Sequence, residues 1–244
     1  PFVLPTVVVG VMFRSLLAEG GVLGGLGLDG AWGGILAAFV FFNLAVVVRT
    51  VGAAWEGLDR RPEEAAATLG ASPAVVFRTV TLPALAPSII SAASVVFLFC
   101  ATAFGVVLTM GGLAYGTVET EIYLLTTALF DLRGAAVLSV VQLVAVVAML
   151  LLADRARPRD PATERAVKAA IPPGRVTAYA LGSVLATVLA VGFVATPVLA
   201  LIVRSLRRGD AWTLDYYVAL GQVGGADGRS ALPVTVWEAL DTSW

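Results

Sequence analysis

Five long apolar segments separated by short polar ones constrain the fold of this chain more than any other feature. They are Phe2 to about Leu17, Trp32 to about Val51, Ala84 to about Met110, Gly134 to about Ala153 and Val176 to about Val203. In a helix, roughly 20 apolar residues cross a bilayer core of about 30 Å. With 59% apolar residues and a mean hydropathy of +0.91, the sequence predicts an all-α integral membrane protein with a bundle of about five transmembrane helices.

What the sequence lacks argues against several functions. The net charge is −1 and the charges lie between the apolar segments, so there is no basic face for nucleic acid. The chain has no histidine, and its single cysteine, Cys100, can form neither an internal disulfide nor a cysteine metal site. The only lysine, Lys168, does not follow a glycine-rich phosphate loop. We therefore expect no catalytic residue, metal or cofactor in this chain.

The polar segment between the second and third apolar segments contains the signals of two short helices. Pro62 suits the first turn of a helix, and Glu63 and Glu64 place negative charge at its positive end. These residues predict a helix that begins near Arg61. Gly70 is suited to the left-handed conformation that ends a helix.

A second short helix is predicted directly after this turn. Ser72 and Pro73 are typical of an N-cap and a first helical position, and the helix is expected to end at about Thr79. Because proline disfavours the helical conformation of the residue before it, Leu82 and Pro83 are expected to mark the entry to the third apolar segment.

This segment, residues 55–83, resembles the cytoplasmic loop signature of the permease subunits of ABC importers, E-A-A-x-x-x-G followed by nine residues and I-x-L-P. The matching residues are Glu64, Ala65, Ala66, Gly70, Leu82 and Pro83, and Val80 stands where the family usually has Ile. The resemblance implies a type I ABC importer permease in which this loop is a coupling helix docked on a cytoplasmic ATPase dimer. That ATPase would bind the ATP. We expect Glu64 to pair with a basic residue of the ATPase and Gly70 to permit the turn.

The resemblance and the charges together predict the organisation of the chain. Residues 1–153 would form most of a first permease domain, and the basic residues 154–175 a linker that is cytoplasmic like the coupling loop. A second permease domain would open with a span at 176–203 and an external segment at 204–244. The chain looks truncated at both ends, and a second coupling loop is expected beyond it. The implied location is the bacterial inner membrane, with several crossings.

Further motifs are similar to those of the thiamine and iron(III) branch of these permeases, in which two halves are fused. They are the segment 97–108, Gly111-Gly112, the segment 117–123 (T-V-E-T-E-I-Y), Ala135-Ala136 and Gln142. The resemblance implies a small solute as cargo, thiamine or a related compound, with iron(III) as the alternative. It also implies an external, periplasmic substrate-binding protein as a partner.

Two polar features have alternative interpretations. Asn43, in the middle of the second apolar segment, either bonds a neighbouring helix, which we favour, or lines the transport pathway. Residues 117–133 contain an apolar middle that is too short to cross the bilayer, and predict an external helix lying against the bundle.

Two other classes of protein fit the spans less well. A membrane-embedded enzyme would need paired acidic or histidine side chains inside the spans, whereas Asp and Glu lie almost wholly between them. A multi-span structural or receptor-like protein would explain the spans but not the spacing of the loop signature.

Overall fold

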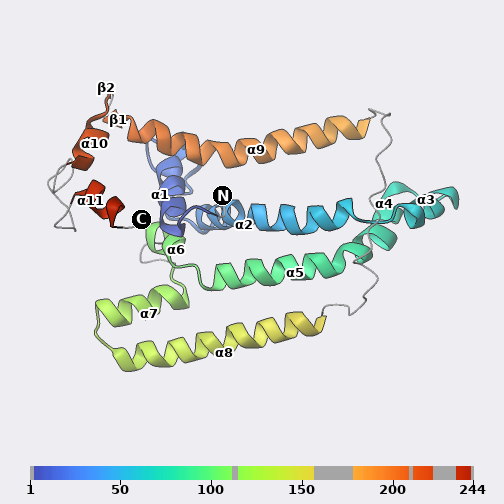
Figure 1. Ribbon diagram of the computed structural model, residues 1–244, viewed down its shortest axis with the longest axis horizontal. Coiled ribbons are helices and arrows are strands. Elements are labelled where there is room, and N and C mark those ends of the chain that lie inside the picture. The colour runs from blue at the N-terminus through green and yellow to red at the C-terminus, as the bar shows by residue number, and fades with distance from the viewer. Residues whose placement is uncertain (1–2, 112–114, 157–177, 209–210, 222–234, 243–244) are drawn as a thin grey trace.

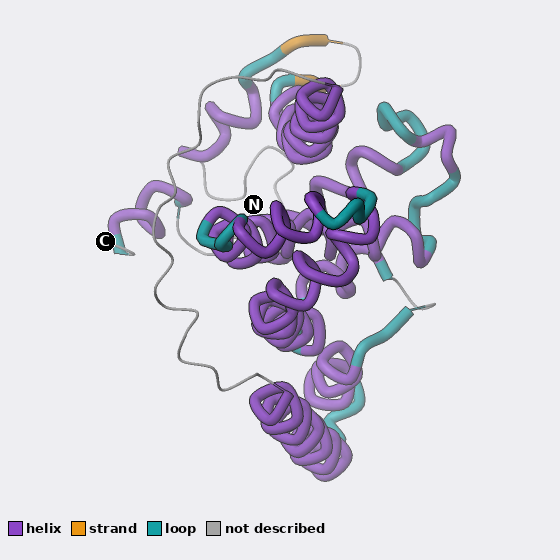
Figure 2. The backbone as a smooth tube through the Cα atoms, turned by 90° about the vertical axis from the view of Figure 1, so that its right-hand side faces the viewer, coloured by secondary structure: helices purple, strands orange, loops and turns teal. Residues whose placement is uncertain are grey.

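The computed structural model describes residues 3–111, 115–156, 178–208, 211–221 and 235–242. Its longest helices are α2 (Trp32–Glu56), α5 (Leu82–Ala101), α8 (Leu132–Ala156) and α9 (Ala178–Ser205). They run alongside one another across Figure 1 and are seen mostly end-on in Figure 2. Among the described residues, four helices are long and apolar enough to cross a membrane, and α1 (Thr6–Leu17) is apolar but shorter. The predicted all-α membrane bundle is therefore confirmed, and within the first predicted segment, Phe2 to about Leu17, the structure has the 12-residue helix Thr6–Leu17.

The buried core lies at one end of the bundle, where α1 packs against α6 (Gly105–Met110) and the first half of α2. Its fully buried side chains include Val9 and Met12 of α1, Ile35 and Phe41 of α2, and Val106 of α6. In contrast, only 6% of the span windows of α8 and α9 is buried within the protein. Such large exposed apolar surfaces are rare on soluble proteins, and here they are the faces that lipid covers.

Helix α9 contacts the same core from the other side. The Phe193 ring lies edge-on to Phe13 of α1 and to Phe41 of α2, with centroid distances of 6.3 and 6.2 Å. Further along α9, Arg204 Nη1 donates to Ser15 Oγ at 3.1 Å. Helix α9 therefore shares the core of α1 and α2, although it is more distant in sequence.

The third predicted span, Ala84 to about Met110, is wrong as a single helix. Helix α5 ends at Ala101, and α6 begins at Gly105 after a break. At the break, Gln142 Nε2 of α8 donates to the Ala101 carbonyl at 3.4 Å, and the Thr102 hydroxyl donates to the Leu98 carbonyl at 2.9 Å. The Leu98 carbonyl also accepts from the Thr102 N–H, whereas the Ala101 carbonyl at the helix end is satisfied by the Gln142 side chain, as a broken helix in lipid requires.

The predicted end of the second short helix at Thr79 is wrong. Helix α5 begins at Leu82, as predicted, but Leu82 keeps the helical conformation that Pro83 was expected to disfavour. Helix α4 (Pro73–Val76) continues through a π turn (Phe77–Thr81) into α5 without leaving the helical conformation. In the π turn the Leu82 N–H donates to the Phe77 carbonyl, five residues back. This wider turn accommodates Pro83, which has no N–H to donate, so the chain does not need to break there.

Helix α7 (Val118–Thr127) confirms the short helix predicted within residues 117–133. The Thr117 hydroxyl caps it by accepting from the Thr120 N–H, and α7 then packs against α8. The fourth and fifth predicted spans correspond to α8 and α9 with slightly different ends. Residues 154–156 continue α8, and the rest of the predicted linker, residues 157–175, lies outside the described residues.

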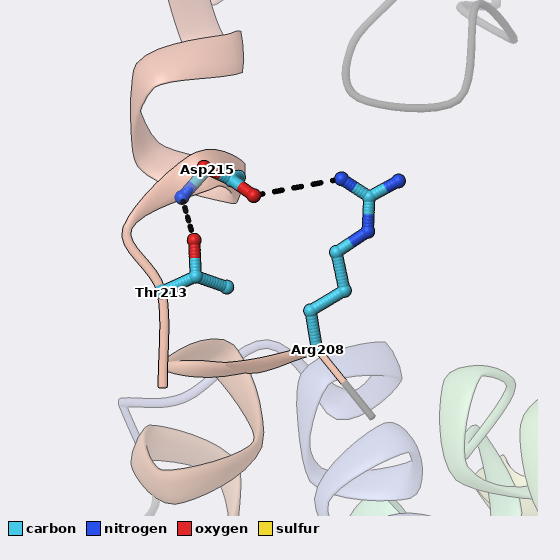
Figure 3. A network of polar contacts seen from close by, with 3 residues as sticks. All are labelled: Arg208, Thr213 and Asp215. Atoms are coloured by element: carbon cyan, nitrogen blue, oxygen red, sulfur yellow. Dashed lines mark hydrogen bonds and ion pairs between the residues drawn. The ribbon is translucent and has the colours of Figure 1, made fainter. Parts of the chain in front are cut away.

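The remaining elements are short. The 3-10 turn Gly24–Leu26 lies in the loop after α1, and β1 (Arg207–Arg208) pairs antiparallel with β2 (Ala211–Trp212) after α9. They are followed by α10 (Asp215–Val218), a 3-10 turn (Ala219–Gly221) and α11 (Val236–Asp241). Arg208 Nη1 lies 3.6 Å from Asp215 Oδ2, and the backbone N–H of Asp215 donates to the Thr213 hydroxyl (Figure 3).

The close contact between α1 and α6 depends on glycine, and this can be tested. A Cβ at Gly105 would lie 2.4 Å from the Val7 nitrogen, whereas a Cβ at Gly192 of α9 would meet nothing within 4 Å. Gly105→Ala should therefore destabilise the fold by about 1–3 kcal/mol. Thermal unfolding of the purified protein in detergent should show a lower midpoint for Gly105→Ala and no decrease for Gly192→Ala. Equal midpoints for the two variants would contradict the close contact.

Candidate functional site

The segment that carries the loop signature projects from one end of the bundle. Helix α3 (Arg61–Thr68), α4 and the π turn lie together at the end of Figure 1 opposite to the core of α1 and α6 and to the strands. Helix α3 has no buried residue. The segment is therefore attached to the bundle mainly through its two ends and a few side-chain contacts.

The start of α3 follows the local signals in the sequence. Asp59 Oδ1 accepts from the Arg61 N–H at 3.0 Å, which satisfies one of the free donors at the helix start. Pro62 occupies the first turn, and Glu63 and Glu64 place their charges there. The predicted helix start near Arg61 is confirmed.

The end of α3 is a Schellman motif at Gly70. This glycine has φ +85°. Its N–H donates to the Ala67 carbonyl at 3.0 Å, and the Ala71 N–H donates to the Ala66 carbonyl at 3.1 Å. A Cβ at Gly70 would meet nothing within 4 Å, so glycine is required by the backbone conformation and not by lack of space.

The predicted site residues lie on two neighbouring elements. Glu64, Ala65 and Gly70 are exposed on α3 or its turn, and Ala66 is half-buried. In the second group, Val80 is half-buried in the π turn, and Leu82 and Pro83 are exposed at the start of α5. The two groups are 10 to 19 positions apart in sequence, yet α3 packs against the π turn. The structure thus brings α3 against the second half of the signature.

The contact that joins these halves was not predicted. The Thr81 hydroxyl donates to Glu63 Oε1 at 2.5 Å, and Thr81 is only 4% exposed. The Phe77 ring of the π turn lies against the Trp55 ring at the end of α2, with centroids 6.0 Å apart. Sequence analysis assigned Glu63 only to the helix dipole, because a pair 18 residues apart follows no helical period.

The outer surface of the loop combines charge with an exposed apolar side chain. Glu64 is exposed on α3, and Leu69 at the end of the helix is 88% exposed. An exposed leucine beside small residues and a carboxylate is chemically suited to contact with another protein.

Inside the bundle, Asn43 makes a helix contact, as favoured. Its Nδ2 donates to the Phe39 carbonyl at 3.0 Å and to Cys100 Sγ of α5 at 3.5 Å, and the residue is 4% exposed. A second polar contact was not predicted as part of a site: Gln142 Nε2 donates to Glu119 Oε2 at 2.7 Å, which joins α7 to α8. Both contacts hold helices together in the membrane region.

The fold and the loop define a class: a multi-span membrane protein with a capped helix exposed at one end. Sequence comparison identifies the family. Residues 1–159 match the family described as binding-protein-dependent transport system inner membrane component, and the chain belongs to it. The matched region includes α3 and the whole loop signature.

Individual relatives carry different transport names. The chain is 35% identical over 160 residues to the sulfate transport system permease protein CysT of Salmonella typhimurium, covering 62% of this chain and 57% of CysT. It is 38% identical over 119 residues to the molybdenum transport system permease protein ModB of Azotobacter vinelandii, covering 46% and 53%. It is 35% identical over 123 residues to the thiamine transport system permease protein ThiP of Escherichia coli, covering 50% and 23%.

The chain thus aligns with just over half of the length of CysT and ModB and with less than a quarter of ThiP. No solved structure matches it.

The conformation of Gly70 gives a test of the local structure. Gly70→Val places a β-branched residue in a left-handed position at a cost on the order of 1 kcal/mol or more, so the end of α3 should open about fivefold more often. Hydrogen–deuterium exchange of peptides covering residues 61–72 should show this as faster exchange. Gly70→Asn should change exchange much less, because asparagine tolerates this conformation. Identical protection in all three proteins would contradict the assigned turn.

Proposed function

We propose that this chain is a membrane-spanning permease part of an ATP-binding cassette importer, which moves a small solute across the bacterial inner membrane. The observation that carries the proposal is the loop: a capped helix with Glu64, Ala65, Ala66 and Gly70 at fixed positions, exposed at one end of an apolar bundle. Membership of the transport family supports the same conclusion.

In this proposal the loop is cytoplasmic and α3 is the coupling helix for a separate ATPase dimer, which binds ATP. Glu64 pairs with a basic residue of the ATPase, and the exposed Leu69 enters an apolar part of its groove. At the other end of the bundle, an external substrate-binding protein delivers the solute. The chain itself then needs neither cofactor nor catalytic residue, and closure of the ATPase dimer moves α3 and the spans.

For the cargo we propose thiamine or a related compound, with iron(III) as the alternative. The support is the set of motifs around α6 and α7 and the similarity to ThiP. In the same proposal, residues 176–244 open a second permease half, in agreement with a family match that ends at residue 159 and a further long apolar helix after it.

An oxyanion is a second candidate cargo. The alignment with CysT, a protein named for sulfate transport, covers 62% of this chain, whereas the alignment with ThiP covers 50%. ModB is named for molybdenum transport. A structural or receptor-like membrane protein without transport activity is the alternative from another class, and it would not require an ATPase.

The ATPase contact is tested by reversing one charge. Glu64→Arg in the full-length protein should abolish co-purification of the partner ATPase, because the carboxylate would be replaced by a cation facing a basic residue. Glu121→Arg makes the same change in charge on exposed α7, and should leave the ATPase bound. If the wild-type protein itself retains no ATPase, the importer proposal is wrong.

The cargo is tested by reconstitution. The permease, its ATPase and the external binding protein are placed in proteoliposomes, and ATP hydrolysis is measured with thiamine, ferric iron, sulfate or molybdate. Thiamine should stimulate hydrolysis and accumulate inside. Stimulation by ferric iron alone would select the first alternative, and stimulation by sulfate or molybdate alone would refute the thiamine assignment.

A further inference from the structure

Helix α3 is joined to the transmembrane helices by very few contacts, so each contact matters for any movement that passes between them. The helix buries none of its residues, and its C-terminal turn is exposed through Ser72 apart from a half-buried Ala71. A movement of α3 therefore reaches the bundle through the chain ends or through its contacts with α4 and the π turn.

The hydrogen bond between Glu63 and Thr81 is the polar member of these contacts. Helical threonines elsewhere in the protein donate to their own helix: Thr79, Thr109 and Thr196 each bond the carbonyl four residues back. Thr81 instead donates across to the carboxylate of another helix, at 2.5 Å and in a buried position. Hydrogen bonds to a charged acceptor are about twice as strong as neutral ones.

Thr81 also lies at a mechanically distinct place, the last residue of the π turn. There the chain has a wide turn closed by the Leu82 N–H and the Phe77 carbonyl, and Phe77 contacts Trp55 of α2. A π turn can tighten to a regular turn by shifting one residue, which makes it a site where a helix bends or shifts.

We propose that Glu63 is a positioning residue that fastens the coupling helix to α5 through Thr81, so that movement of α3 enters the membrane at the π turn. This inference rests on the proposed function, since it assigns α3 the role of receiving the ATPase. Glu64 contacts the ATPase, whereas Glu63, one position earlier, bonds Thr81 in the π turn that leads into α5. Loss of the link would leave the ATPase bound but its movement poorly transmitted.

The link itself is measured without the ATPase. In full-length protein with Cys100→Ala, cysteines replace exposed Ala67 on α3 and exposed Ala93 on α5 and carry spin labels. Pulsed electron paramagnetic resonance in lipid nanodiscs then gives the distance distribution. Thr81→Val should increase the population with a displaced α3 about tenfold, and Thr79→Val, which removes a hydroxyl bonded within its own helix, should not. Glu63→Gln keeps an acceptor oxygen and should retain most of the wild-type distribution.

Transmission is measured in the complex. Thr81→Val should retain the ATPase on co-purification but lower permease-stimulated ATP hydrolysis about tenfold, whereas Thr79→Val should leave both unchanged. Glu63→Ala, on a half-exposed side chain, repeats the test if Thr81→Val does not insert.

A wild-type distance distribution in Thr81→Val and Glu63→Ala would overturn the link, and displacement of α3 with unchanged hydrolysis would overturn its role in transmission. Absence of the ATPase from the wild-type protein would instead refute the proposed function, while the distances still report whether the link exists.

Discussion

The hydrocarbon interior of a bilayer offers no hydrogen-bond partner, so polar groups inside the bundle depend on partners that the protein itself supplies. The break between α5 and α6 is accompanied by side-chain donors from Gln142 and Thr102. Next to Pro83, which has no N–H to donate, a π turn keeps the chain helical. The Asn43 Nδ2 group donates to Cys100 and to its own helix, whereas its Oδ1 has no hydrogen-bond partner among the described residues. At the break after Ala101, a neighbouring helix thus supplies a bond that the interrupted helix has lost.

The sequence predicted those features that depend on local chemistry. Helix α3 begins and ends where Pro62 and Gly70 indicated, because caps and left-handed glycine are properties of a few adjacent residues. The α8 and α9 spans were found because 20 or so apolar residues in lipid have little alternative to a helix. The α7 helix was found as well, although its end at Thr127 was not.

Features that depend on contacts between distant segments were missed. Hydropathy is continuous from Ala84 to Met110, so it does not reveal that the chain breaks after Ala101, where α6 must turn to pack against α1. Pro83 suggested a helix boundary, because the conformational preference of the residue before a proline is a local property. The π turn that overrides this preference is not a local property. The Glu63–Thr81 hydrogen bond was missed because it joins α3 to the π turn across 18 positions in sequence.

The packing of α9 has a consequence for how the polypeptide is divided into parts. The family match ends at residue 159, yet Phe193 fills the space beside Phe13 and Phe41, and Arg204 reaches Ser15. A boundary drawn from sequence similarity therefore does not coincide with a boundary in the solid body of the protein. Of the described residues after 159, α9 is packed onto the first region through shared aromatic rings, so this helix and the α1–α2 core form one packed unit.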